Sequence, residues 1–151
     1  MKEITQRQKV FIALPLKKKE KEYYGTCEVI YAHIPVVGEV LGRRFAIDRN
    51  TPDTYCVLPY AQQTKTGKVV FKDDTISDNF KELELMSLFL YDDLDECIAS
   101  CRQSNEYYQR IFANDHTIDM LNALVSVQEE EIGKATNYIE NYLGINKEKG
   151  L

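Results

Sequence analysis

Apolar and polar residues alternate through the first half of the chain in short runs that are typical of β-strands. Residues 9–16, 23–34 and 40–47 are rich in aromatic and β-branched side chains, which favour strands. Turns are predicted at 35–38 and at 48–53, where Gly, Pro, Asp and Asn are concentrated. Because the connections are short, successive strands are expected to pair as antiparallel neighbours.

Two further runs, residues 54–61 and 68–71, predict a hairpin whose turn lies at 64–67. Gly25 falls inside the second predicted strand and is interpreted as a β-bulge. The charged run at 17–22 is predicted to be a loop between the first two strands. Together these runs predict an antiparallel β-meander or a small barrel.

Residues 81–91 fit two secondary structures. Leu83, Leu85 and Phe89 alternate with their neighbours as in a strand buried on both faces, whereas Ser77 could instead cap a helix. The period of a short apolar run does not separate these two alternatives. We favour the strand.

The second half of the chain has helical periodicity. Asp93, followed three residues later by Glu96, is typical of a helix N-terminus, and apolar residues at helical spacing extend this helix to about Ala113. Asn114 and Asp115 then interrupt the pattern and allow a second helix to begin.

The second predicted helix carries a long apolar stripe. Gly144 followed by lysines predicts its C-terminus, and Gly133 lies opposite the stripe. The members of the stripe are three and four residues apart, like the core positions of a coiled coil: Ile118, Leu121, Val125, Gln128, Ile132, Ala135, Ile139 and Tyr142.

A small β unit cannot cover so long a stripe, so two arrangements remain open. Either the two helices pack together within the chain, or the stripe forms a dimerisation element, in which Gln128 would set the register. In the second case a homo-oligomer would form through Ile118, Leu121, Val125, Ile132 and Ile139. The predicted fold class is α+β, an N-terminal antiparallel meander or small barrel followed by two C-terminal helices.

Composition indicates a single domain of 151 residues, mainly β up to residue 91 and helical over 92–145. The chain is 44% hydrophobic and 28% charged, as in ordinary globular proteins. The apolar stretch at 10–16 is too short for a signal-peptide core, and no stretch approaches the length of a membrane span. We therefore expect a cytoplasmic protein with reduced cysteines and no membrane partner.

Charge divides the chain near Asp73. Residues 1–72 carry 13 Lys and Arg against 7 Asp and Glu, a formal +6, and residues 73–151 carry 6 against 17, a formal −11, which sums to −5. This division predicts two surfaces with different partners. A long duplex nucleic acid is disfavoured, because the acidic half would repel phosphates.

The sequence contains no pattern that predicts catalysis, a metal or a cofactor. Cys97 and Cys101 share a helical face as two metal ligands might, but no further ligand is near them in sequence, and free cysteines usually pack in apolar cores. The glycines form neither a P-loop nor a dinucleotide fingerprint. His33 and His116 have no predicted nucleophile partner, and His116 is interpreted as a capping or interface residue. We therefore predict that the protein is not an enzyme.

Arginine and tyrosine side chains are the candidates for binding an anion, because Arg forms paired hydrogen bonds with phosphate or carboxylate and Tyr can stack on a base. One grouping lies in the basic half and the other on the first predicted helix. The ordinary alternative is a solvated lysine loop and ion pairs with the acidic helices. The predicted ligand-binding residues are Lys19, Tyr23, Tyr24, Arg43, Arg44, Arg102, Tyr107 and Arg110.

These patterns predict a non-enzymatic binding protein, oligomeric, that holds a small anionic ligand of the phosphorylated or nucleotide-like class. The alternative function is an acidic inhibitor or adaptor that occupies a basic groove on a partner protein. In that case the acidic surface would include Glu129, Glu130 and Glu131.

Overall fold

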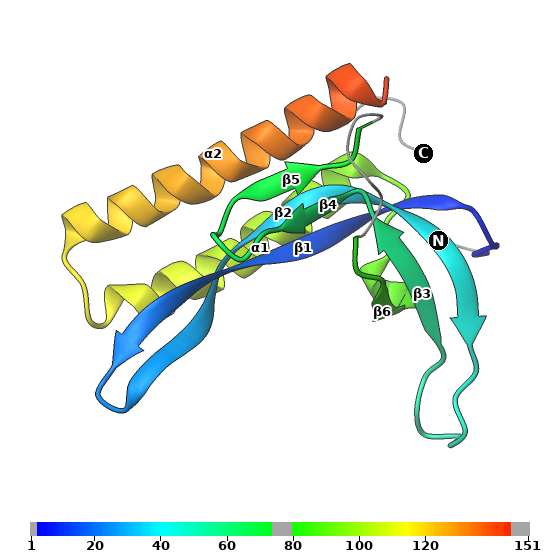
Figure 1. Ribbon diagram of the computed structural model, residues 1–151, viewed down its shortest axis with the longest axis horizontal. Helices are drawn as coiled ribbons and strands as arrows, with labels where there is room; N and C mark the ends of the chain where they lie inside the picture. The colour runs from blue at the N-terminus through cyan, green and yellow to red at the C-terminus, as the bar shows by residue number, and fades with distance from the viewer. Residues whose placement is uncertain (1–2, 74–79, 146–151) are drawn as a thin grey trace.

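The computed structural model describes residues 3–73 and 80–145, which form two β-sheets and two long helices (Figure 1). The larger sheet is antiparallel and has the strand order β1-β2-β3-β6. Its strands are β1 (Lys9–Glu22), β2 (Gly25–Arg44), β3 (Thr54–Pro59) and β6 (Leu83–Met86). The smaller sheet is a hairpin of β4 (Ala61–Gln63) and β5 (Val69–Phe71). A short 3-10 helix, η1 (Ser87–Phe89), precedes α1 (Leu94–Ala113) and α2 (Ile118–Tyr142).

The predicted α+β class is confirmed, and the sheet is open rather than closed into a barrel. Figure 1 shows α2 running along the top of the molecule with β5 beneath it. The hairpin of β1 and β2 projects at one end, and the connection between β2 and β3 projects at the other. The strand β2 therefore spans the whole length between the two projections.

The strands β1 and β2 are longer than the sequence predicted. The run at 17–22 is part of β1, because every residue in it pairs with β2, so the predicted loop is wrong. The turn predicted at 35–38 is also wrong, because β2 continues through it. Pro35 is tolerated inside the strand because β3 pairs with β2 only from Gly38 onward, so no ladder hydrogen bond is lost there.

The hairpin of β1 and β2 turns at Tyr23 and Tyr24. Gly25 closes this turn with a φ of +135°, a conformation that glycine adopts readily, so its interpretation as a bulge is wrong. The irregularity lies further along, where Leu16 pairs with Ala32 but Lys17 pairs with residue 30, which leaves Tyr31 as the extra residue of β2.

The remaining β predictions are largely confirmed. The connection at 48–53 and the hairpin turn at 64–67 lie where they were predicted, although Tyr60 separates β3 from β4 and moves the chain into the second sheet. The favoured strand in 81–91 is present as β6, which ends at Met86, and η1 follows it. The alternative cap, Ser77, lies outside the described residues.

Both predicted helices are confirmed, and each begins at a side-chain cap. The Asp93 carboxylate accepts a hydrogen bond from the Asp95 N–H (3.1 Å), and the Thr117 hydroxyl accepts one from the Met120 N–H (3.3 Å). The helices cover β2, and the core between them and the sheet includes the fully buried Phe11, Ile34, Val57, Leu94 and Ile139.

The apolar stripe on α2 is buried within the chain from Gln128 to Ile139 and exposed at both of its ends. Ile132 and Ile139 lie in the core, with 3% and 0% of their surface exposed, so a second copy could not reach them. Ile118 and Tyr142, at the two ends of the stripe, are 75% and 74% exposed. A self-association surface stays a prediction that could involve only the first part of the stripe, from Ile118 to Val125.

Candidate functional site

A groove of about 1030 Å³ opens between the hairpin of β1 and β2, the turn that joins β4 to β5, and the first half of α2. Its α2 wall is apolar and consists of Met120, Ala123, Leu124 and Val127. These residues are three or four positions apart and therefore lie on one face of the helix. Met120 is 49% and Val127 41% exposed, so this wall presents apolar surface to solvent.

The opposite wall of the groove is basic. Lys17 and Lys19 lie two residues apart on β1 and therefore on the same face of the strand, and Lys65 comes from the β4–β5 turn. Within residues 3–73 and 80–145, no carboxylate lies within ion-pairing distance of these three lysines. Glu28 also lines the groove, but its single negative charge is outweighed by the three lysines, so the net charge of this wall is positive.

Lys18, between these two lysines on β1, already has contacts within the chain. Its Nζ lies 5.8 Å from the ring centroid of Tyr31 and 5.6 Å from that of Phe112, and 3.4 Å from the Glu20 carboxylate. Both rings line the groove. Lys18 therefore links β1 to the end of α1 through its cation–π contact with Phe112, and the neighbouring lysines carry the unpaired charge.

Gln63 fixes the β4–β5 turn against β1. The Lys17 N–H donates to Gln63 Oε1 (2.7 Å), and Gln63 Nε2 donates to the carbonyl oxygens of Lys17 (2.9 Å) and Gly67 (3.0 Å). Gly67 has a φ of +92°, which favours glycine at this point of the turn. These contacts hold the two basic segments in place before any ligand binds, which reduces the entropy that binding must overcome.

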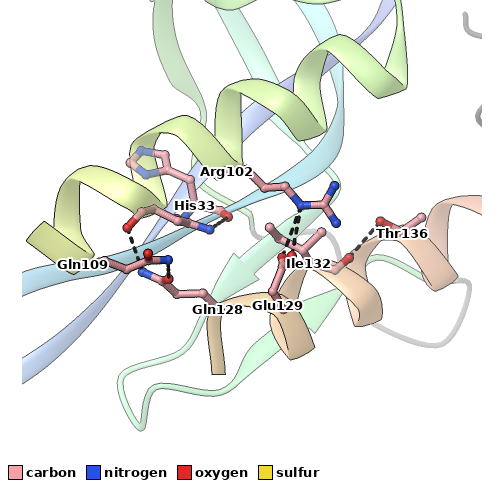
Figure 2. A network of polar contacts seen from close by, with 8 residues as sticks. His33, Arg102, Gln109, Gln128, Glu129, Ile132 and Thr136 are labelled. Carbon is pink, nitrogen blue, oxygen red and sulfur yellow. Dashed lines mark hydrogen bonds and ion pairs between the residues drawn. The ribbon is translucent and has the colours of Figure 1, made fainter. Parts of the chain in front are cut away.

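A network of side-chain amides holds Tyr31, and thus the inner end of the groove, against the helices. Figure 2 shows part of it, with Gln109 of α1 bonded to Gln128 of α2. Gln128 Nε2 donates to the carbonyl oxygens of Tyr31 (2.8 Å) and Asn105 (3.3 Å), and Gln128 Oε1 accepts from Gln109 (2.6 Å). The His33 N–H donates to Asn105 Oδ1 (2.6 Å), and Asn105 Nδ2 donates to the His33 carbonyl oxygen (3.4 Å). Asn105 and Gln128 are 2% and 1% exposed.

The amide network changes the role predicted for Gln128. In the dimer alternative Gln128 would set the register of a seam between two copies, whereas in the structure it bonds within its own chain to the edge of β2. Asn105 was not identified from the sequence, although it falls four residues after Cys101 on the apolar face of α1. A polar residue at a buried position normally has its hydrogen bonds satisfied. The occurrence of an Asn on the apolar face of this helix was therefore the feature of the sequence that could have indicated a buried hydrogen-bonding role.

His33 lies half-buried beside the network, with its ring stacked on that of Tyr108 at 5.5 Å and its Nδ1 3.1 Å from the Tyr108 hydroxyl. Burial lowers the pKa of His33 below the ordinary value of 6.5. The folded protein therefore protonates His33 less readily than the unfolded chain does.

The lowered pKa of His33 predicts a loss of stability in mild acid. As the pH falls below 6.5, the unfolded chain takes up a proton at this residue before the folded chain does, so the free energy of unfolding decreases until the folded-state pKa is reached. Replacing His33 by glutamine removes this contribution. Urea unfolding at about pH 7.5 and about pH 5.5 should therefore show a smaller pH dependence in the variant, and equal pH dependence in both proteins would contradict the expectation.

The structure does not bring the predicted ligand-binding residues together, and of the set only Lys19 lines the groove. Tyr23 and Tyr24 form the hairpin tip and are 94% and 96% exposed. Arg43 and Arg44 lie at the other end of β2, about 60 Å away along the strand at roughly 3.3 Å per residue.

Three of the four predicted arginines form ion pairs within the chain. Arg43 Nε donates to Asp53 (3.1 Å), Arg44 lies 3.4 Å from Glu84, and Arg102 Nε donates to Glu129 across the two helices (3.1 Å). The remaining members of the predicted set, Tyr107 and Arg110, are exposed on α1.

The acidic surface considered for a protein partner is also partly neutralised within the chain. Glu129 pairs with Arg102, and Lys134 lies 3.4 Å from Glu130 and 3.8 Å from Glu131. These are exposed helical pairs of small energetic value. Among the residues that the structure describes, no contact favours this surface over the groove.

Cys97 and Cys101 pack in the apolar core, as predicted, and both are fully buried. A hydrogen bond with Cys101, together with burial, raises the pKa of the Cys97 thiol, so it stays protonated. The described residues contain no cluster of three or more potential metal ligands. His116 caps α1, because its Nδ1–H donates to the Phe112 carbonyl oxygen (2.8 Å).

Comparisons of the chain with known protein families, with curated proteins and with solved structures found no match. In the part of the chain that the structure describes, neither helix has the length and apolar content needed to cross a bilayer. A function must therefore be argued from the groove and its chemistry.

Proposed function

We propose that the protein is a non-enzymatic binding protein of the cytoplasm that holds a small anionic ligand in the groove between β1 and α2. The proposal rests on one observation: Lys17, Lys19 and Lys65 line this groove without a carboxylate partner among the described residues. Unpaired ammonium groups attract phosphate or carboxylate, and the groove volume of about 1030 Å³ lies at the upper limit for small-molecule sites.

The two walls of the groove indicate a ligand with two chemical parts. The anionic part would face the lysines of β1 and the β4–β5 turn, and an apolar or aromatic part would lie against Leu124 and Val127 of α2. A phosphorylated or nucleotide-like molecule has both parts. Burying its apolar part gains roughly 25 cal/mol per Å² of apolar surface, and the lysines provide the preference for an anion.

Two triple variants with the same change in charge test this proposal. The first is Lys17→Gln, Lys19→Gln, Lys65→Gln, in the groove, and the second is Arg44→Gln, Arg102→Gln, Arg110→Gln, at the arginines predicted from the sequence. Native mass spectrometry of protein freshly purified from cells should show a retained small molecule on the wild type and on the arginine variant. The lysine variant should bind that molecule at least about 1000-fold more weakly or not at all, because each of the three lost charged contacts contributes about 1.5–3 kcal/mol and about 1.4 kcal/mol is a tenfold change in affinity.

Loss of the ligand from the arginine variant alone would place the site at the arginines and contradict the groove. Equal retention by all three proteins would exclude both sets of residues. A wild-type protein that carries no additional mass would count against a small ligand altogether.

A further inference from the structure

The main-chain groups of β1 that point away from β2 follow a strict alternation. Phe11 exchanges two hydrogen bonds with Tyr91 (2.7 and 2.9 Å), and Lys17 exchanges two with the Gln63 side chain (2.7 and 2.9 Å). Pro15, which has no N–H, occupies the same outward-facing set. Since the outward direction recurs every second residue, the N–H and C=O groups of Lys19 and Lys21 also point outward.

The edge of β1 is open at Lys19 and Lys21. The described ranges, 3–73 and 80–145, contain no backbone group that bonds to their outward-facing N–H and C=O groups. Among the strands that the structure describes, β1 is at the edge of its sheet, with β2 as its one neighbour there. These two residues therefore offer main-chain donors and acceptors of the kind that pair with an incoming strand.

Elsewhere the fold covers the same kind of edge with side-chain amides. Asn105 bonds to both the N–H and the C=O of His33 on the outer edge of β2, and Gln63 bonds to both groups of Lys17. A side-chain amide offers the same donor and acceptor as a peptide bond. The contact at Lys17 thus shows that an amide group fits beside β1, two residues before Lys19, where the outward-facing main-chain groups have no partner among the described residues.

Charge indicates which strand would fit. The side chains of Lys17, Lys19 and Lys21 lie on one face of β1 in a row, at every second position. A second copy of this edge would place lysine against lysine, which is unfavourable, and such lysines keep like edges apart. A strand with a carboxylate at every second residue would instead place opposite charges in direct cross-strand pairs.

We propose that the open edge of β1 at Lys19 and Lys21 accepts an extended acidic segment of a partner protein as an added β-strand. Main-chain hydrogen bonds would supply the affinity, and the lysine row would select acidic side chains. The inference goes beyond the small-ligand proposal and is separable from it. Lys21 lies outside the groove lining, and Lys65 lies outside β1.

The probe is a fluorescein-labelled heptapeptide, Thr-Glu-Val-Glu-Val-Glu-Thr, and binding is followed by fluorescence anisotropy at low salt. Alternate N–H groups of an extended peptide point to opposite edges. One derivative of the peptide is N-methylated at the three Glu residues, and a second is N-methylated at the two Val residues and the last Thr. Each derivative therefore lacks the N–H donors along one edge of the peptide, and the protein is the same in every measurement. We expect one derivative to bind at least tenfold more weakly and the other to bind like the parent peptide.

Loss of binding with only one derivative supports strand addition and also gives its orientation. Equal binding of both derivatives and the parent overturns the inference, because the main chain would then play no part. Failure of the parent peptide to bind overturns it as well. The protein variant Lys19→Gln, Lys21→Gln should weaken peptide binding, whereas Lys68→Gln, Lys134→Gln removes the same charge elsewhere and should not.

A comparison of two single variants separates this inference from the small-ligand proposal. Lys21→Gln should weaken the peptide and leave any retained small molecule in place. Lys65→Gln should weaken retention of the small molecule and leave the peptide unaffected. Each proposal can therefore fail while the other stands.

Discussion

Replacing Asn105 by leucine is expected to lower the free energy of unfolding by about 2–4 kcal/mol. The leucine has a similar volume but leaves the His33 N–H and C=O without the side-chain amide that satisfies them. Both groups lie at a partly buried edge that α1 covers, so water does not readily replace the amide. The free energy of unfolding of an ordinary domain is only about 5–15 kcal/mol, so this loss would be a large part of the total stability.

Urea unfolding measures this effect, and Asn122 provides the matched control. Asn122 is exposed on α2, and Asn122→Leu should change stability by no more than about 0.5 kcal/mol. If Asn105→Leu were as stable as this control, the amide at the edge of β2 would make no net contribution, and the account of how the helices attach to the sheet would be wrong.

The second large effect is expected for Phe11→Ala, which should destabilise the protein by about 3–5 kcal/mol. The Phe11 side chain is 0% exposed and packs in the core between the sheet and the helices, so its removal leaves a cavity in addition to the lost apolar burial. Its main-chain bonds to Tyr91 involve no side-chain atom and are retained.

Phe45 is the control for the same substitution outside the core. It is 70% exposed on the connection between β2 and β3, where its ring lies 4.8 Å from the Arg43 guanidinium. Phe45→Ala should change the free energy of unfolding by no more than about 1 kcal/mol. Thermal or urea unfolding of the two variants side by side would show whether the core lies where the structure places it; equal destabilisation would contradict it.

The helices could be predicted well because their ends are determined locally. The Asp93 cap and the break at Asn114 are contained within a few residues, so the bounds of α1 could be predicted from the sequence. The lengths of β1 and β2 depend instead on pairing across the hairpin. The charged run at 17–22 forms a strand because its main chain bonds to β2, and charges are acceptable at a sheet edge.

The candidate site could be predicted only in part for the same reason. Lys19 was identified from the basic run, but the apolar wall that faces it, including Leu124 and Val127, lies about a hundred residues later in the chain. Arg44 and Arg102 were grouped by residue type, and the structure places each in an ion pair instead. No local pattern shows which distant segments meet, because that depends on how the helices pack on the sheet.

The amides that cover the edge of β2 have a consequence for synthesis on the ribosome. Tyr31 emerges 97 residues before Gln128, which bonds to its carbonyl oxygen. At roughly 5–20 residues per second, the β1–β2 hairpin would wait roughly 5–20 seconds before its covering helix is made. During that interval the nascent chain presents an uncovered strand edge, so the protein is expected to depend on chaperones while it is being translated, and less so once α2 has docked.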